Sequence, residues 1–253
     1  MTERTGYDRG LVNLILLDTS DRLNDSCVSL TDARATHLLK VLRVTPGQTV
    51  RIGMLDGSFG TGTVEAVNDG RVTMRCVFET DIPPRPRVDV LLALPRPKVM
   101  RRLWAQFAAI GVGQIIVTNA SRVERDYFDT HILTENGYRP LLIEGLQQAR
   151  DTRLPQVSIH RQFRILIEDH LTDLFPSGMR LVADPRGTSS IANALATRDG
   201  RILVAIGPEG GWNEFELGLL EAHGFTRVGL GPRTLRVDTA CVALLSQVHS
   251  WLA

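Results

Sequence analysis

Two glycine-rich segments near the C-terminus hold the residues best suited to chemistry. GPEGGWNE, at 207–214, contains Glu209, and GLGPRTLRVDTA, at 229–240, contains Arg236. Neither has the pattern of a phosphate site: the first lacks the Gly-Lys-Ser/Thr ending of a P-loop, the second lacks the third glycine of a dinucleotide fingerprint, and Glu209 would repel a phosphate. Glycine lets the backbone approach a ligand closely. Backbone groups beside few charges therefore suit a ligand held through an adenine and an uncharged or zwitterionic tail.

Both segments follow apolar runs that are typical of buried strands. RLVAD, at 180–184, is a third such run and leads into PRGTSS, whereas ILVAI at 202–206 and TRVGL at 226–230 lead into the glycine-rich segments. Ligands of an open parallel sheet bind beyond the carboxyl ends of its strands. We therefore expect the three loops to form one pocket, although any one of them alone is compatible with a plain turn.

From residue 88 to the C-terminus, apolar runs alternate with helical patterns. VDVLLAL at 88–94 precedes a helix expected over 99–111, and DTACVALLSQVHSWL at 238–252 is the last helix. Further helices are expected over 140–150, with a proline in the first turn, and over 189–196. This succession predicts an α/β domain, in which helices cover a parallel sheet.

The first 80 residues have a different pattern. β-rich runs at 48–55, 61–67 and 71–78 are separated by the turn signals DGSFG and NDG, LVNLILL at 11–17 reads as a further strand, and 32–43 is helical. Mostly antiparallel strands with one helix predict a small β-barrel. The proline-rich DIPPRPR that follows cannot continue a helix or a central strand, so we place a domain boundary there, between 1–82 and 83–253.

The composition excludes several classes of protein. With 253 residues, of which 43% are hydrophobic, the chain can bury one large core or two smaller ones. No apolar run is long enough to span a membrane and no cleaved signal is evident, so we expect a cytoplasmic protein. The three cysteines are far apart and the six histidines lack metal-ligand spacing. We therefore expect neither a disulfide framework nor a metal site.

The two glycine-rich motifs carry a family resemblance. IGPEGGWNEFE at 206–216, followed by LGPRTLRVDTA at 230–240, resembles the paired signature of the RsmE family, the 16S rRNA uridine-N3 methyltransferases of the knotted SPOUT class. Weaker matches at 36–48, 94–112 and 146–157 extend the resemblance over nearly the whole chain. Two departures are Gln106 and Ala109, where the family carries a lysine and an acid.

The resemblance implies the fold, the cofactor and the partners. Residues 1–82 would form a PUA-like β-barrel that binds RNA, and 83–253 a SPOUT methyltransferase domain whose last segment threads a trefoil knot. The protein would act as a homodimer, with S-adenosyl-L-methionine (SAM) as the methyl donor and 16S rRNA or the small ribosomal subunit as the substrate. The expected donor-binding residues are Ala183, Pro185, Ile206, Gly207, Pro208, Gly211, Leu230, Gly231, Leu235 and Ala240.

Two charged residues are the candidates for catalysis. Uracil N3 carries a proton at neutral pH, so the enzyme must align the reactants and stabilise the anion that forms. A guanidinium from Arg236 near O2 or O4 would do this, and the alternative is a structural ion pair with Glu209 or Asp238. Glu209 would accept the N3 proton, fix Arg236 or bind backbone amides. Arg233 and Asp238 are expected to be structural, the latter as a helix cap.

The middle third of the chain is the basic one. Residues 81–164 hold 13 Lys and Arg against 8 Asp and Glu, and this excess suits a phosphate backbone. The candidate RNA-binding residues are Arg43, Arg96, Lys98, Arg101 and Arg153. The alternative is a solvated surface.

These features favour a SAM-dependent methyltransferase acting on uridine N3 of 16S rRNA. The alternative is a non-catalytic RNA-binding or ribosome-assembly protein that retains the knotted fold. A nucleotide hydrolase is disfavoured, because the phosphate-loop lysine and metal ligands are missing.

Overall fold

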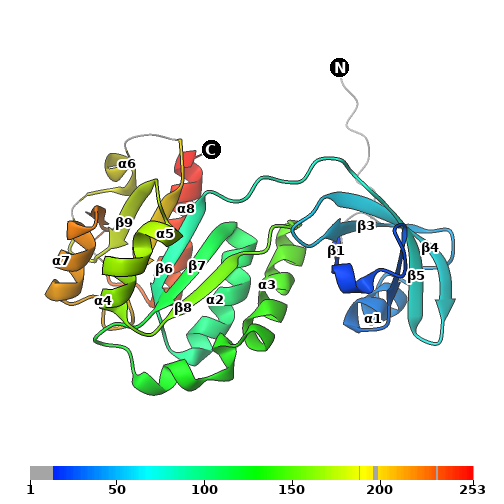
Figure 1. Ribbon diagram of the computed structural model, residues 1–253, viewed down its shortest axis with the longest axis horizontal. Helices are drawn as coiled ribbons and strands as arrows, with labels where there is room; N and C mark the ends of the chain where they lie inside the picture. The colour runs from blue at the N-terminus through cyan, green and yellow to red at the C-terminus, as the bar shows by residue number, and fades with distance from the viewer. Residues whose placement is uncertain (1–13, 188, 196–198, 232, 253) are drawn as a thin grey trace. The chain divides into compact units, whose positions relative to one another are not determined.

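The computed structural model describes residues 14–187, 189–195, 199–231 and 233–252 (Figure 1). Its contacts divide the chain into two compact units. The first contains residues up to Pro84 together with Leu146–Leu154, and the second contains Arg85–Gly145 and the residues from Pro155 onward. The first unit therefore includes a short segment from the middle of the chain.

In the first unit, the described residues form a mixed five-stranded sheet in the order β1-β3-β4-β5-β2. The strand β1 runs parallel to β3, and the other neighbours are antiparallel. Asp32 caps the helix α1 by accepting a hydrogen bond from the Arg34 backbone N–H at 2.9 Å. The bounds are β1 Leu14–Leu17, β2 Cys27–Leu30, α1 Ala33–Lys40, β3 Thr49–Met54, β4 Phe59–Asn68 and β5 Arg71–Phe78. The strands and the helix expected from the sequence are thus present; residues 11–13 of the first expected strand lie outside the described residues.

The segment 146–154 is tied to the first unit by a buried threonine. Thr152 is fully buried, its hydroxyl donates to the carbonyl oxygen of Gly57 at 2.7 Å, and its own carbonyl accepts from the Asp56 N–H at 2.8 Å. A Cβ on Gly53 would lie 2.6 Å from the Thr152 methyl group, so the sheet has room for this side chain only beside a glycine.

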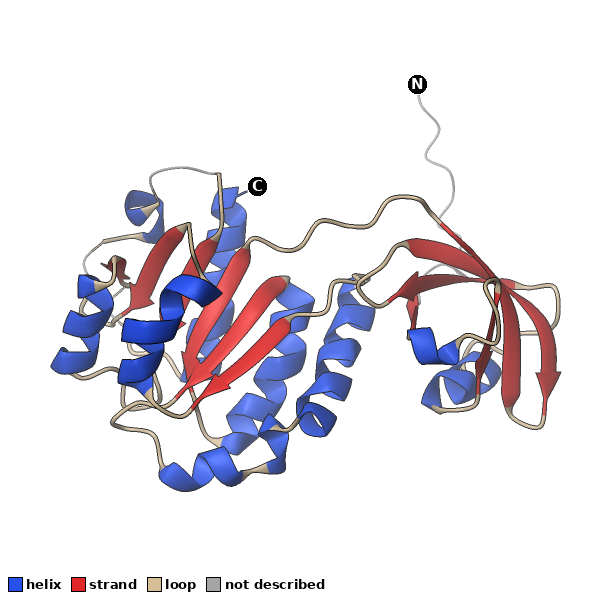
Figure 2. Cartoon of the chain, viewed as in Figure 1, coloured by secondary structure: helices blue, strands red, loops and turns tan. Residues whose placement is uncertain are grey.

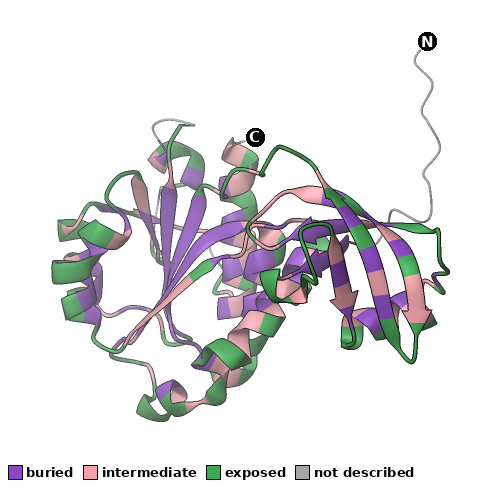
Figure 3. Ribbon diagram, turned by 45° about the vertical axis from the view of Figure 1, so that its right-hand side comes forward, coloured by how far each residue is buried: buried purple, intermediate pink, exposed green. Residues whose placement is uncertain are grey.

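In the second unit, the described strands form a parallel sheet in the order β11-β9-β10-β6-β7-β8. Every neighbouring pair is parallel, as the apolar runs predict. All residues of β6, β7 and β10 are buried (Figure 3), which is expected of strands covered on both faces. The bounds are β6 Val88–Ala93, β7 Val112–Thr118, β8 Gln156–His160, β9 Met179–Ala183, β10 Ile202–Ile206 and β11 Phe225–Val228.

Helices cover both faces of this sheet (Figure 2). The helices α2 and α8 pack together, and α8 also contacts β6 and β10; the opposite face is covered by the helical stretch 163–174 and by α7. That stretch is α4 Phe163–Ile165, a π-helical turn Leu166–His170 and α5 Leu171–Leu174. The other helices are α2 Pro97–Ile110, α3 Glu135–Ala149, α6 Ile191–Ala194, α7 Glu214–Ala222 and α8 Val237–Leu252, with short 3-10 turns at Thr19–Asp21, Arg125–Asp129 and His131–Leu133.

Several expected helices have other bounds; the one expected over 32–43, for example, ends at Lys40. The helix expected over 140–150 begins at Glu135, so that Pro140 lies inside it rather than in its first turn. Of the helix expected over 189–196, the described residues form the four-residue α6, which begins after its N-cap Ser190; residue 196 lies outside the described residues. Proline favours the first turn of a helix, so Pro140 was a reasonable start signal; its place inside α3, where it removes one backbone donor, cannot be recognised from the local sequence.

The segments that follow β9 and β11 cross at two glycines. Asp184 N–H donates to the Val228 carbonyl at 3.0 Å, and Gly229 N–H donates to the Ser189 carbonyl at 3.0 Å. A Cβ on Gly187 would lie 2.6 Å from the carbonyl carbon of Val228, and one on Gly229 would overlap the Gly187 carbonyl oxygen. The crossing of these two backbones therefore requires glycine at both positions. Beyond it, the chain returns from the edge strand to place α8 at the middle of the sheet.

Candidate active site

The carboxyl ends of four neighbouring strands surround a cavity of about 650 Å³. The loops that follow β9, β10 and β11 line it, as their order predicts, and α8 closes it with Ala240 and Leu244. The N-cap residue of α2, Arg96, also lines the cavity, as do Val99 and Arg102 from the first turns of this helix. Every residue expected to hold the methyl donor lies on this wall: Ala183, Pro185, Ile206, Gly207, Pro208, Gly211, Leu230, Gly231, Leu235 and Ala240.

The loop between β10 and α7 is closed by its own backbone. Gly211 has φ +69° and donates its N–H to the Pro208 carbonyl at 2.8 Å. This left-handed conformation favours glycine. Asn213 and Glu216 then form the capping box expected from the sequence, with two hydrogen bonds of 2.8 Å between them. The loop thus turns tightly at the cavity before α7 begins.

Glu209 binds the backbone at the start of α2. Its Oε1 accepts a hydrogen bond from the Arg96 N–H at 3.0 Å, and Arg96 is the N-cap residue of α2. A carboxylate there is favoured by the partial positive charge of the helix N-terminus. Within the described residues, its side chain makes no other hydrogen bond and no ion pair with Arg236. Of the three roles open from the sequence, the backbone contact is thus present.

Asp238 pairs with α2 rather than with Arg236. Arg102 Nη2 lies 2.6 Å from Asp238 Oδ2, and the Thr239 N–H donates to Oδ1 at 3.0 Å. Burial acts to raise the pKa of Asp238, but the hydrogen bonds from Arg102 and Thr239 and the charge of Arg102 outweigh it, so the pKa lies below its usual value. This carboxylate joins the first turn of α8 to α2 across the cavity wall.

Arg236 is exposed on the cavity wall. Its side chain makes no hydrogen bond or ion pair with any other residue in the described ranges. Glu209 and Asp238, the two partners considered for a structural ion pair, are both engaged elsewhere. The guanidinium is therefore available to a charge that enters the cavity.

Asp184 is a cavity residue that the sequence did not single out. It is 6% exposed and lies 3.3 Å from Arg186 Nη2 and 3.2 Å from Arg227 Nη1. Burial acts to raise its pKa, but the hydrogen bonds from Arg186 and the charges of Arg186 and Arg227 lower the pKa below its usual value. Its position as the last residue of RLVAD, next to the expected loop, was the available signal.

The candidate RNA-binding residues are divided between the two units. In the second unit, Arg96 lines the cavity, and Lys98 and Arg101 are exposed on the first turns of α2. In the first unit, Arg43 is exposed just after α1 with φ +53°. Arg153 is half-buried and donates to the Asp56 carbonyl at 2.9 Å, so part of its donor capacity is used inside that unit.

The described residues contain neither a candidate membrane span nor a candidate metal-binding cluster. Among the described helices, none combines the length and the apolar composition that a membrane span requires. No group of three or more His, Cys, Asp or Glu side chains in the described ranges has an arrangement that would hold a metal ion.

The cavity lies wholly within a region that matches a known protein family. The RNA methyltransferase domain model matches residues 83–249. The chain belongs to the RNA methyltransferase domain family. In this family member, residues 30–75 also match an RNA methyltransferase PUA domain. The expected order, a PUA-like domain before a methyltransferase domain, is confirmed.

Curated relatives and solved structures cover nearly the whole chain. The ribosomal RNA small subunit methyltransferase E of Treponema pallidum is 28% identical over 95% of this chain and 93% of its own, and methyltransferase E 1 of Borreliella burgdorferi is 25% identical over 85% and 89%. The methyltransferase E of Neisseria gonorrhoeae, solved bound to S-adenosyl methionine, superposes with a TM-score of 0.76 at 21% identity over 94% and 97%. A probable rRNA methyltransferase from Porphyromonas gingivalis has a TM-score of 0.76 at 21% identity over 94% and 98%. The structural likenesses establish the fold.

Proposed function

We propose that this protein is a SAM-dependent methyltransferase that methylates N3 of a uridine in 16S ribosomal RNA. The main support for this proposal is the cavity at the carboxyl edge of the parallel sheet. Every expected donor-binding residue lines it, and Arg236 lies on its wall without a protein partner among the described residues. The names of the relatives, small-subunit rRNA methyltransferases, and the donor bound to the Neisseria gonorrhoeae protein support the choice of substrate and cofactor.

The cavity suits SAM in size and in chemistry. About 650 Å³ lies within the usual range for a small-molecule site. Apolar side chains of Ile206, Leu230 and Leu235 alternate on the wall with backbone groups of the glycine-rich loops. Such a wall suits an adenosyl group, and the ionic residues at the cavity suit a zwitterionic methionine end. SAM supplies an electrophilic methyl group.

The two candidate catalytic residues have distinct tasks in this proposal. Arg236 stabilises negative charge on the uracil ring as N3 loses its proton, because a fixed guanidinium near the developing anion lowers the barrier. Glu209 is held by the Arg96 N–H through Oε1. Its Oε2, which has no hydrogen-bond partner among the described residues, is the acceptor we assign to the N3 proton.

The remaining parts of the proposal concern RNA, assembly and location. Arg96, Lys98 and Arg101 bind the phosphate backbone beside the cavity, and the PUA-like unit supplies a second RNA contact through Arg43. The glycine crossing after β9 and β11 belongs to a trefoil knot threaded by α8. The protein is a homodimer in the cytoplasm, where its ribosomal substrate is made.

Two measurements test the function. Calorimetric titration with SAM should show one site per chain, and absence of binding would exclude a methyltransferase. Single-turnover methyl transfer to 16S rRNA from a strain that lacks the protein should yield 3-methyluridine. Binding of SAM and rRNA without transfer would instead favour the non-catalytic assembly protein.

A further inference from the structure

The segment that follows β7 fastens the glycine-rich loop 207–213 from outside the cavity. Arg122 Nη1 donates to the carbonyl oxygen of Gly210. One residue earlier, the Ser121 N–H donates to Glu216 Oε1 at 2.6 Å. The two segments are about 90 residues apart in the chain, yet they share two hydrogen bonds at the point where the loop passes into α7.

The Glu216 side chain links two segments of backbone. It is 3% exposed, and its Oε2 accepts from the Asn213 N–H at 2.8 Å in the capping box. The capping box alone uses one carboxylate oxygen. The second oxygen is the one that accepts from Ser121, so the start of α7 is fixed to the β7 segment as well as to itself.

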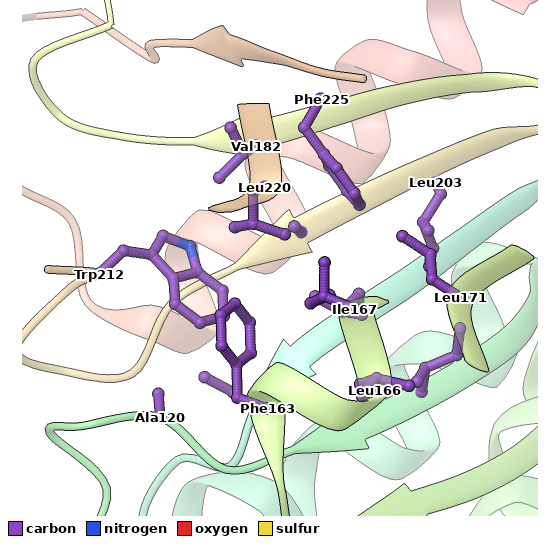
Figure 4. Packing of buried hydrophobic residues seen from close by; sticks show 14 of the residues in the cluster. Ala120, Phe163, Leu166, Ile167, Leu171, Val182, Leu203, Trp212, Leu220 and Phe225 are labelled. Atoms are coloured by element: carbon purple, nitrogen blue, oxygen red, sulfur yellow. The ribbon is translucent and has the colours of Figure 1, made fainter. Parts of the chain in front are cut away.

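A buried aromatic contact anchors the same region. Trp212 and Ala120 belong to one apolar cluster, and the Trp212 and Phe163 rings lie 5.4 Å apart at 35° (Figure 4). Figure 4 shows the two rings side by side, with Ala120 close to them. The part of the loop after Gly211 is thus packed in the core, whereas the part before it reaches the cavity.

Arg122 fixes the orientation of the peptide between these two parts. The Gly210 carbonyl accepts from Arg122, and the Gly211 N–H of the same peptide donates to Pro208. A Cβ on Gly210 would lie 2.8 Å from Arg122 Cδ, so glycine leaves room for the arginine stem. Both polar groups of this peptide are engaged, while Pro208, Glu209 and Gly211 line the cavity.

We propose that Arg122 is a positioning residue for the methyl-donor site. It does not line the cavity. It holds the 210–211 peptide on the outer side, as the Arg96 N–H holds Glu209 on the inner side. Loss of this contact frees the peptide to rotate and disorders the donor-binding wall. The inference rests on the proposed function, because it assumes that the cavity binds SAM.

The test compares three full-length variants. Arg122→Met keeps the aliphatic part of the side chain and removes the guanidinium, whereas Arg122→Lys retains a cationic donor. Arg125→Met is the matched control, because Arg125 is exposed on the same segment three residues away. Arg122→Met should raise the SAM Kd about tenfold, because the freed 210–211 peptide would hold its binding-competent orientation only about a tenth of the time. Arg122→Lys should recover part of the loss, and Arg125→Met should bind as the wild type does.

Three further readouts separate positioning from general destabilisation. The thermal midpoint and the rRNA Kd of Arg122→Met should match those of the wild type, and its transfer rate at saturating SAM should stay within about twofold of the wild-type rate. In the absence of SAM, the amides of residues 207–213 should exchange faster than in the wild type. An unchanged SAM Kd, or unchanged exchange in this loop, overturns the role of Arg122. If the wild-type protein itself does not bind SAM, the proposed function fails and this inference fails with it.

Discussion

At the carboxyl edge of the parallel sheet, Arg236 is exposed and lies on a cavity wall, whereas at the opposite edge Arg201 covers a fully buried carboxylate. Arg201 Nη2 lies 2.6 Å from Asp89 Oδ2, near the start of β6. The same guanidinium donates to Gln114 at 3.1 Å and lies 5.1 Å from the centre of the Phe175 ring. The two ends of the sheet thus differ: the arginine at one end is bound to a buried acid, and the arginine at the other is exposed at a cavity.

Arg201 pairs with a buried carboxylate and so stabilises the fold, whereas Arg236 has no protein partner among the described residues and can bind a ligand. Burial raises the pKa of Asp89 to about 6, although the charge of Arg201 and its hydrogen bond act to lower it. A buried carboxylate of this kind depends on its partner for stability. Arg236 pairs with no buried carboxylate among the described residues. Substitutions at the two edges should therefore change different properties of the protein.

Arg236→Ala should have the largest effect on activity. Removal of one group that stabilises developing charge typically costs about 10²- to 10³-fold in rate, so single-turnover methyl transfer should fall by that factor, while the thermal midpoint stays unchanged. Arg233→Ala is the control, since Arg233 lines the same cavity and is exposed. An equal loss in both variants, or full activity of Arg236→Ala, contradicts the catalytic assignment.

Arg201→Met should show the converse pattern. It leaves the buried Asp89 carboxylate unpaired, and breaking a buried pair costs about 3 kcal/mol at the lower end of the usual range. The lower end applies because the Arg201 side chain is 39% exposed. Urea unfolding should report this loss, and methyl transfer per folded molecule should stay at the wild-type value. Unchanged stability would show that the ion pair is dispensable.

The pH dependence of stability should reveal Asp89 itself. Its folded-state pKa, about 6, lies above the usual 3.8, so its favourable contribution is present below the usual value and is lost as the pH rises through 6. The stability of the wild type relative to Asp89→Asn should thus fall by about 2 kcal/mol between about pH 4.5 and 6.5. Unfolding free energies at several pH values measure this. A constant difference, or a rise, contradicts the assigned pKa.

Lys98→Ala should have a small effect, confined to RNA. Loss of one phosphate contact should raise the rRNA Kd about threefold and lower the slope of log Kd against log salt by about one. Arg164→Ala is the control, because Arg164 is an exposed arginine that pairs with Glu168 on the other face of the sheet. Filter binding at several salt concentrations gives both quantities. An equal slope change in the control would indicate a nonspecific charge effect.

Much of the second unit is predictable from local pattern. Buried parallel strands are continuous apolar runs, so VDVLLAL and ILVAI are recognisable as strands, and the glycine-rich segments after them mark the ligand edge. The capping box of Asn213 and Glu216 is also readable, because it is a contact between near neighbours in sequence.

Contacts between distant segments are the part that the sequence did not supply. Asp89 and Arg201 are 112 residues apart, and Arg122 and Gly210 are 88 apart. The sequence around each of these residues does not indicate which distant residue it contacts. The cavity wall supplied by α2 was missed for the same reason: the strand order, which places β6 beside β10, brings Arg102 to the loops. The four-residue α6 shows that even a local pattern can overestimate the length of a helix.

The methylated nucleotides of 16S rRNA from a strain that lacks this protein would show whether it methylates a uridine at N3. We expect the loss of one 3-methyluridine in the deletion strain, its return with the wild-type chain and its continued absence with Arg236→Ala. A complete set of methylated nucleotides in the deletion strain, or restoration by the Arg236→Ala chain, would contradict this expectation.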